Sequence, residues 1–560
     1  MRSLAALAAA ILALLALPAA AGAASDLVHP PSLDTPPAGY RLTGNQVEAV
    51  AGRVPKIVRA VKAHPGSYPS VWTKGPGRWQ VSWFTRGKHY KEIAQVSVDD
   101  ASGRVLEAWT GFQVPWTMAR GYPGAFGRKA DSLWIWLPLT ILFVAPFVDW
   151  RRPRRMLHLD LAVLAAFGIS LAFFNHANIS ASVPVVYPLL AYLLVRMLWI
   201  GLRPPGRARS AEPLRLLVPA SWLAIATIFL LGFRVGLNVT NSNVIDVGYA
   251  GIIGAHKLSH GQPVWGHFPA DNPSGDTYGP VAYAAYVPFE RIWPWAGRWN
   301  GLPGAHAAAI AFDLLCVALL FLIGRRVRGP TLGIALAYAW TAFPFTLFAL
   351  ATNSNDALVS VLVLAALYAA LHPARRGVLV GLAGLAKFAP LALAPLFAMH
   401  AWPPGRGART FARFAAGFAV AVGASLALVL WHSSLHTFYD RTLGFQATRG
   451  APFSVWGLYG GGWSIGQHVV QAGAVALAIA VAFLPRRRDA IGLAALSAAV
   501  LVALELGATY WFYLYLVWFA PLVLVASLGE PGAAVTVAAA PSTARAPARS
   551  HRPAAVVSSG

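Results

Sequence analysis

Long apolar runs separated by short polar loops fill the chain from about residue 133 to residue 528. Most runs approach the roughly 20 apolar residues that a helix needs to cross a bilayer. The pattern predicts an α-helical polytopic membrane protein with about 12–13 membrane segments. The apolar runs are Leu133–Trp150, Leu157–Phe174, Val185–Leu202, Leu216–Phe233, Ala305–Ile323, Leu332–Ala351, Ala357–Leu371, Val378–Met399, Phe411–Trp431, Val469–Leu484, Ile491–Leu506 and Tyr510–Leu528.

The first residues of the chain have a pattern typical of export. Arg2 gives a positive start, Leu4–Leu17 forms a short apolar core, and Ala21–Ala23 fits a small-residue cleavage site. Residues 1–23 are therefore predicted to be a signal peptide. An uncleaved anchor helix is the alternative, and either one exports the residues that follow.

Residues 24–130 show the periodicity of a small folded domain. Apolar residues in Val47–Val61 recur at helical spacing, whereas Trp79–Trp83, Ile93–Val98 and Val105–Trp109 are predicted strands. We predict an extracytoplasmic α+β domain with one helix packed on an antiparallel sheet. The segment Asp99–Gly103 between the last two strands is a predicted turn, and its two aspartates are better explained by turn chemistry than by catalysis.

Composition supports a membrane protein and changes the meaning of its charge. Hydrophobic residues make up 57% of the 560 residues, charged residues only 12%, and mean hydropathy is +0.55. The net charge of +24 comes from arginines that cluster in short loops between apolar runs, not on one soluble face. Such loops mark the cytoplasmic side of a membrane protein, so a nucleic-acid partner is rejected. The lone Cys316 excludes an intrachain disulfide.

The arginine loops also orient the predicted segments. With the N-terminal domain outside, successive arginine clusters fall inside only if Val378–Met399 enters and returns as a hairpin broken near Lys387 and Pro390. The tail 529–560 is then cytoplasmic, and its Ala/Pro-rich composition predicts disorder. This threading brings the polar loops 238–303, 352–356 and 433–467 together outside a bacterial plasma membrane.

Asp246 is the foremost candidate for chemistry in these loops. It follows a predicted span by about ten residues, so its carboxylate can act as a general base just above the membrane. A helix-capping or solvated acid is the alternative explanation for this placement.

Several sequence motifs resemble known families. A set of motifs in the second half of the chain is similar to GT-C glycosyltransferases, and most of all to glycosyltransferase family 87. The motifs are the run from Asp246 through Gly261-Gln-Pro-Val-Trp265 to Thr277-Tyr-Gly-Pro280, then Asn355-Asp356, Gly381–Pro390 and Phe438–Trp456. The similarity covers about 216–528. Residues 44–111 resemble a PepSY-type domain, which implies a binding or regulatory role.

The resemblance to family 87 implies an activity. A polyprenyl-phosphate-linked sugar, a mannose-like hexose or a pentose, would be transferred with inversion to an extracytoplasmic glycan, glycolipid or protein. Asp246 corresponds to the family's catalytic base. Residues 211–528 would form the catalytic membrane domain, and residues 131–210, with three additional transmembrane helices and a basic linker, have no counterpart in the family.

Charge and residue type suggest the remaining substrate-binding residues. Lys387, Arg441 and Arg449 are candidates for contact with the lipid phosphate, because arginine and lysine are common phosphate ligands. Asp276 and Asp356 can position a sugar hydroxyl or help to bind a divalent metal, whose presence is left open. No metal ligand set is predicted, because His256, His260 and His267 show no tight ligand spacing. The other predicted substrate-binding residues are Tyr278, Asn355, Gln446, Trp265 and Trp456. For the aromatic ones, a place in the belt of aromatic side chains at the membrane interface is the alternative explanation.

Two other classes of function compete with a transferase. A transporter or flippase of lipid-linked saccharides should show paired broken helices, and the sequence shows one clear break, in Val378–Met399. A non-catalytic PepSY-bearing membrane assembly protein is the other alternative.

Overall fold

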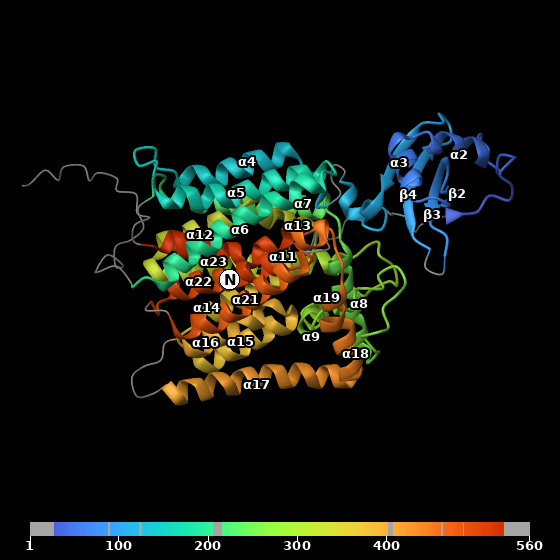
Figure 1. Cartoon of the computed structure of the whole chain (residues 1–560). Helices are drawn as coiled ribbons and strands as arrows, with labels where there is room; N and C mark the ends of the chain where they lie inside the picture. The colour runs from blue at the N-terminus through green and yellow to red at the C-terminus, as the bar shows by residue number, and fades with distance from the viewer. Residues whose placement is uncertain are drawn as a thin grey trace, which may run out of the picture.

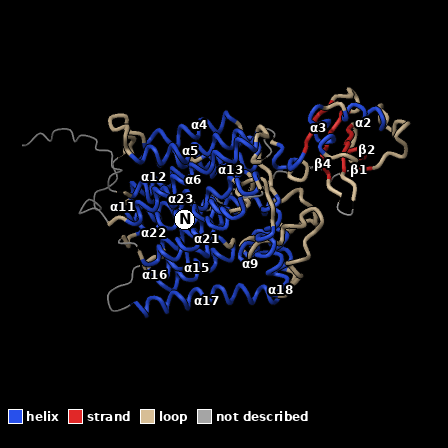
Figure 2. The backbone as a smooth tube through the Cα atoms, in the orientation of Figure 1, coloured by secondary structure: helices blue, strands red, loops and turns tan. Residues whose placement is uncertain are grey.

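A computed structural model describes residues 27–87, 90–121, 126–204, 216–400, 407–460, 463–484 and 487–530. The predicted signal peptide, and the predicted tail beyond Glu530, lie outside these residues. A small mixed domain sits beyond one end of a large helical bundle, and the strands belong to the small domain (Figures 1 and 2). The predicted fold class, an α-helical polytopic protein with a small N-terminal α+β domain, is confirmed.

The small domain is an antiparallel meander with sheet order β1-β2-β3-β4-β5. The predicted single helix is in fact two, because Pro55 begins a second helix after a break at Arg53–Val54. Both helices contribute apolar side chains, among them Val47 and Ile57, to the core of the sheet. The elements are β1 (Leu27–Val28), α2 (Gly44–Gly52), α3 (Pro55–Ala63), β2 (Tyr68–Lys74), β3 (Arg78–Phe84), β4 (Glu92–Asp99) and β5 (Val105–Thr110).

The predicted turn between β4 and β5 is confirmed. Asp99 accepts a hydrogen bond from the backbone N–H of Ser102 at 2.8 Å, and Gly103 has a φ of 66°. Asp100 accepts hydrogen bonds from the backbone N–H groups of Arg41 and Leu42 and from the Trp79 indole. Both aspartates therefore serve the fold of the small domain.

The bundle reproduces the predicted apolar segments with shifted ends. Seven described helices are long and apolar enough to cross a membrane, or eight if the bent pair α12–α13 is one span, and four shorter apolar helices accompany them. The principal helices are α4 (Leu133–Val144), α5 (Met156–Asn175), α6 (Ile179–Leu202), α7 (Ala220–Thr240), α11 (Pro303–Arg328), α12 (Pro330–Ala342), α13 (Pro344–Ala351), α14 (Asp356–Tyr368), α15 (Pro373–Ala386), α16 (Ala394–Met399), α17 (Gly407–His432), α21 (Ser464–Phe483), α22 (Ala490–Gly507) and α23 (Leu516–Gly529).

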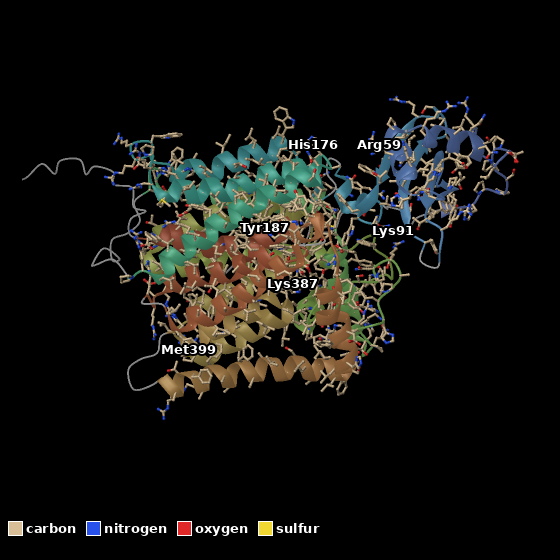
Figure 3. The ribbon with its side chains drawn as sticks, in the orientation of Figure 1. Arg59, Lys91, His176, Tyr187, Lys387 and Met399 are labelled. Carbon is tan, nitrogen blue, oxygen red and sulfur yellow. The ribbon has the colours of Figure 1, made fainter. Side chains whose placement is uncertain are left out.

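The segment predicted as a broken hairpin does turn back on itself. Helix α15 ends at Ala386, Lys387 is extended, and a 3-10 turn at Ala389–Leu393 leads into α16. The Arg376 guanidinium near the start of α15 donates to the carbonyls of Ala398 and His400 beyond the turn. Both ends of the segment therefore lie at the same end of the bundle, where Met399 is seen far from the small domain (Figure 3).

A second break separates α12 from α13, and the prediction of a single broken segment is wrong. The two helices meet at 58°, and Pro344 begins the second one after the extended residue Phe343. Residues 341–351 around this break are all buried in the core of the bundle. The break is therefore a packing feature and does not open into a polar cavity.

The basic loops gather at the end of the bundle remote from the small domain. One hollow of about 340 Å³ is lined by Arg326, Arg328 and Arg488. Another of about 290 Å³ is lined by Arg155 and Arg203. Arginines of separate loops are thus brought together, and the side of the membrane that they face stays a prediction.

A buried ion pair joins α7 to α11. Arg234 is fully buried, its Nη2 lies 2.5 Å from Asp313 Oδ1, and Nη1 donates to the carbonyl of Thr341 and the hydroxyl of Thr346 beside the α12–α13 break. The Trp340 indole donates a further hydrogen bond to Asp313. The predicted span Leu216–Phe233 ended one residue before this arginine, whereas α7 continues to Thr240.

Replacing Arg234 by leucine should strongly destabilise the bundle. The change leaves the Asp313 carboxylate buried without its cation, which costs about 3–5 kcal/mol in comparable buried pairs. Unfolding of the purified protein in detergent measures the loss. Arg291→Leu, at an exposed position of α10 (Val287–Ile292), is the matched control and should change stability little. Equal effects of the two variants would contradict a role for the buried pair.

Candidate active site

A cavity of about 450 Å³ lies at the end of the bundle that faces the small domain. It contains four of the predicted charged residues: Asp246, Asp356, Lys387 and Arg449. These come from parts of the chain up to 203 residues apart in sequence. The predicted convergence of outer loops is therefore found as one polar cavity, with Tyr278 also in its wall.

Asp246 is held by the backbone on both of its sides. The N–H groups of Asn243 and Ile245 donate to the carbonyls of Ala351 and Thr352 at 3.1 Å, which ties the segment before α8 (Asp246–Ser259) to the end of α13. Gly248 permits this approach, since a Cβ at this position would lie 2.1 Å from the carbonyl oxygen of Asn353. Asp246 thus begins a helix whose first turn is packed against a fixed loop.

The Asp246 side chain is open to the cavity but surrounded by protein on its other sides. This burial raises the pKa of its carboxyl group, and nearby Asp356 raises it further. The backbone N–H of Val247 and the cations Arg449 and Lys387 act in the opposite direction without cancelling the rise. A carboxylate of raised pKa is a stronger base than an ordinary aspartate, which suits it to accept a proton near neutral pH.

Lys387 lies inside the bundle at the break of the hairpin (Figure 3). Its Nζ is 2.5 Å from Asp356 Oδ1, and that oxygen also accepts from the Trp518 indole at 3.0 Å. Gly279 lets the outer loop approach the turn, because a Cβ there would lie 2.0 Å from the carbonyl oxygen of Leu385. Asp356 Oδ2 is buried and makes no hydrogen bond to a described residue, although Asp356 is among the residues that line the cavity.

Arg449 has a different environment from Lys387. Its guanidinium lies over the rings of Tyr510 at 4.0 Å, Trp116 at 5.4 Å and Phe445 at 5.6 Å. No carboxylate among the described residues is within ion-pair distance of it. Aromatic faces hold the cation without neutralising it, so its charge is available to an anion in the cavity.

Arg441 and Asp276, predicted to contact substrate, instead bind each other outside the cavity wall. Two guanidinium nitrogens of Arg441 donate to the two carboxylate oxygens of Asp276 at 2.6 and 2.7 Å. Asp276 also accepts from the backbone N–H of Gly266 at 2.6 Å. This bidentate pair joins two outer loops and places neither group in the described cavity wall.

The remaining predicted residues are also outside the described cavity wall. Trp265 is fully buried against Tyr283 and Phe438, so a sugar ring cannot stack on it in this conformation. Trp456 donates its indole N–H to the carbonyl of Leu506 at 2.8 Å. Gln446 is exposed on α19 (Phe445–Thr448), and Asn355 is buried beside Asp356 with no described hydrogen-bond partner for its amide.

Several wall residues were missed by sequence reasoning. Tyr510, Phe512 and Tyr515 line the cavity just before α23, and sequence analysis assigned them to a membrane span. Trp299 comes from the long outer loop, and its indole donates to the carbonyl of Val244 at 2.9 Å. The dense aromatic run 510–515 was the available signal, since aromatic side chains are frequent in carbohydrate and lipid sites as well as in spans.

One group of residues could hold a divalent cation. Ligand atoms of His256, His260 and Glu290 all lie within 4.8 Å of one another, and the two histidines are one turn apart on α8. The expectation that these histidines lack ligand spacing is therefore wrong, because two imidazoles and a carboxylate are a common zinc ligand set. At present His256 Nδ1 is bonded to Glu290 at 2.8 Å, and none of the three lines the cavity.

Part of the chain is similar to a known protein family. Residues 277–509 match the family model described as Glycosyltransferase family 87. The chain carries a glycosyltransferase region. Tyr278, Asp356, Lys387 and Arg449 fall within the match, whereas Asp246 precedes it.

A solved structure of ArnT from Cupriavidus metallidurans bound to undecaprenyl phosphate is similar with 15% identity and a TM-score of 0.39. The similarity covers 56% of this chain and 60% of that one, less than two thirds of ArnT. A search among curated proteins gave no match.

The pairing of Arg441 with Asp276 gives a test of which cations belong to the cavity. Arg441→Gln should lower the stability of the protein by about 1–3 kcal/mol, because the buried Asp276 carboxylate loses both bonds to its cation and keeps only the one from Gly266. It should leave the affinity for a polyprenyl phosphate nearly unchanged. Thermal unfolding and binding of undecaprenyl phosphate, measured on the same preparation, separate the two effects. A large loss of lipid affinity with unchanged stability would return Arg441 to the binding site.

Proposed function

We propose that the protein transfers a sugar from a polyprenyl-phosphate-linked donor to an extracytoplasmic acceptor, with inversion and with Asp246 as the general base. The observation that carries the proposal is the cavity in which an open carboxylate of raised pKa faces an arginine without a carboxylate partner. The family 87 match supports transfer of a sugar. The sugar is a mannose-like hexose or a pentose, and the acceptor is a glycan, glycolipid or protein.

The chemistry follows from the placement of these charges. Asp246 takes the proton of an acceptor hydroxyl as its oxygen attacks the anomeric carbon. The bond from that carbon to the phosphate oxygen breaks on the opposite face, which inverts the configuration. The departing lipid phosphate carries the negative charge, and Arg449 can bind it through two parallel N–H donors.

Lys387 and Asp356 act together in this scheme. The lysine is already paired with Asp356, so its charge is largely balanced and its role in this scheme is to keep the hairpin turn in place. The second oxygen of Asp356 is buried in this conformation, so the carboxylate serves mainly to hold the lysine beside the cavity. Tyr278 and Tyr515 lie near the lysine, with its ammonium 5.4 and 5.7 Å from their ring centres, and complete this side of the cavity.

Asp246→Asn should abolish sugar transfer while donor lipid binding is retained. The amide preserves the shape of the side chain but cannot accept the hydroxyl proton, and loss of a general base lowers rates by about 10²–10⁴-fold. Glycan and glycolipid profiles of a deletion strain, complemented at matched membrane abundance, give the readout. Asp271→Asn is the matched control, since this nearby exposed acid does not line the cavity.

The complementation separates the rival functions as well. Restoration of the missing glycan by Asp271→Asn but not by Asp246→Asn supports the transferase. Equal restoration by both variants refutes Asp246 as the base and favours a transporter or an assembly protein, since neither needs a base at this position.

The pH dependence of transfer provides an independent check on Asp246. The base must be deprotonated, so activity is present above its pKa and is lost as the pH falls through it. Because burial raises this pKa, the acid limb of kcat/KM should lie above the ordinary aspartate range near pH 3.9. Protein held at each low pH and then assayed at pH 7 must recover full activity. An acid limb at or below pH 4 in reversibly inhibited protein contradicts the assignment.

A further inference from the structure

The wall of the cavity is completed by a segment that belongs to the N-terminal extension. After β5 the chain runs through short 3-10 turns at Gly111–Gln113 and Thr117–Arg120 toward the bundle. Pro115, Trp116, Thr117 and Met118 from this segment line the same cavity as Asp246. The family 87 match begins only at residue 277, so this wall lies outside the matched region.

Trp116 is the central contact of this segment with the bundle. Its ring packs edge-on against Phe453 with centroids 5.4 Å apart and lies 6.1 Å from the ring of Tyr510. The Arg449 guanidinium lies 5.4 Å from its centre. Tyr510 is also fixed from this side, because its hydroxyl donates to the sulfur of Met118 at 3.4 Å.

These contacts determine where the Arg449 charge can lie. A flexible arginine without a carboxylate partner can adopt many rotamers, and aromatic faces on two sides reduce that freedom. Two of the aromatic faces, those of Tyr510 and Phe445, come from the bundle, and the third comes from the extension through Trp116. The bundle alone therefore lacks one of the three faces that orient the cation.

The segment is anchored at both of its ends. On the side of the small domain, Arg120 donates to Gln95 of β4 at 2.5 Å and to the carbonyl of Val114 at 2.9 Å. On the side of the bundle, Gln113 donates to the carbonyl of Ala177 at 3.3 Å, and the N–H of Gly127 donates to Asn243 at 2.9 Å. Asn243 is three residues from Asp246, so the same anchor joins the extension to the segment that holds the base.

We propose that residues 115–118 of the N-terminal extension form part of the binding site for the polyprenyl phosphate, with Trp116 as the positioning residue that orients Arg449 toward the phosphate. The inference rests on the proposed function and deepens it. The small domain then has a direct structural connection, through Arg120 and Gln95, to the group that holds the donor.

Kinetics of Trp116 variants test the positioning role. Trp116→Ala should raise KM for the lipid donor about 3- to 10-fold, the range expected when one cation–π contact is removed. Trp116→Phe keeps an aromatic face and should recover most of the affinity. Trp72→Ala is the matched control, because Trp72 lies on β2 of the small domain and does not line the cavity. An unchanged donor KM in folded Trp116→Ala, or no recovery in Trp116→Phe, overturns the positioning role.

A labelling experiment tests the location without relying on turnover. The natural Cys316 is fully buried, so a cysteine introduced at the exposed, cavity-lining Thr117 provides a single accessible thiol. Undecaprenyl phosphate in detergent should slow maleimide labelling of Thr117→Cys, and undecaprenol without the phosphate should slow it less. Ala101→Cys, at the exposed β4–β5 turn, should label equally under all conditions.

The outcomes distinguish this inference from the proposed function. Protection of Thr117→Cys by the phosphate lipid supports the composite site even if Asp246→Asn retains transfer, in which case only the assignment of the base fails. Equal labelling of Thr117→Cys with and without the lipid overturns the composite site, even where Asp246→Asn abolishes transfer and the proposed function stands.

Discussion

The cost of burying charge in a membrane-spanning bundle is the constraint on which the site depends. A buried ion loses its hydration, and only a well-placed partner with additional hydrogen bonds offsets that loss. Lys387 meets this requirement through Asp356, and Trp518 satisfies the same carboxylate oxygen. The pair holds the break of the α15–α16 hairpin against the start of α14. The floor of the cavity is therefore fixed by electrostatics as well as by apolar packing.

Two other buried ion pairs inside the bundle follow the same rule. Arg234 is paired with Asp313 between α7 and α11, and Arg196 is paired with Asp160, which also accepts from Tyr192 and Ser527. Arg449 departs from it, since aromatic rings surround it and no described carboxylate neutralises it. A cation kept out of water with no described carboxylate partner at ion-pair distance loses hydration, and a functional site is a sufficient reason to maintain it.

Sequence periodicity predicted the bundle well because apolar length is a local property of the chain. Each predicted run has its helix, and even the hairpin near Lys387 followed from the placement of arginines. Pairing is a long-range property, which explains why the contacts of several site residues were not predicted. Nothing near Arg441 in sequence indicates that Asp276 occupies it, and nothing near Trp265 indicates that Tyr283 and Phe438 enclose it. The split of the helix 47–61 at Pro55, in contrast, could have been predicted from the proline.

The composite origin of the cavity changes how the extension should be regarded. An appended domain joined by a loose tether can act on a catalytic site only by raising the local concentration of a ligand. Here the connecting segment is itself in the wall, and its hydrogen bonds reach β4 on one side and the loop before Asp246 on the other. We therefore expect a displacement of β4 relative to the bundle to strain the contact between Trp116 and Arg449, because tightly packed contacts transmit displacement instead of absorbing it.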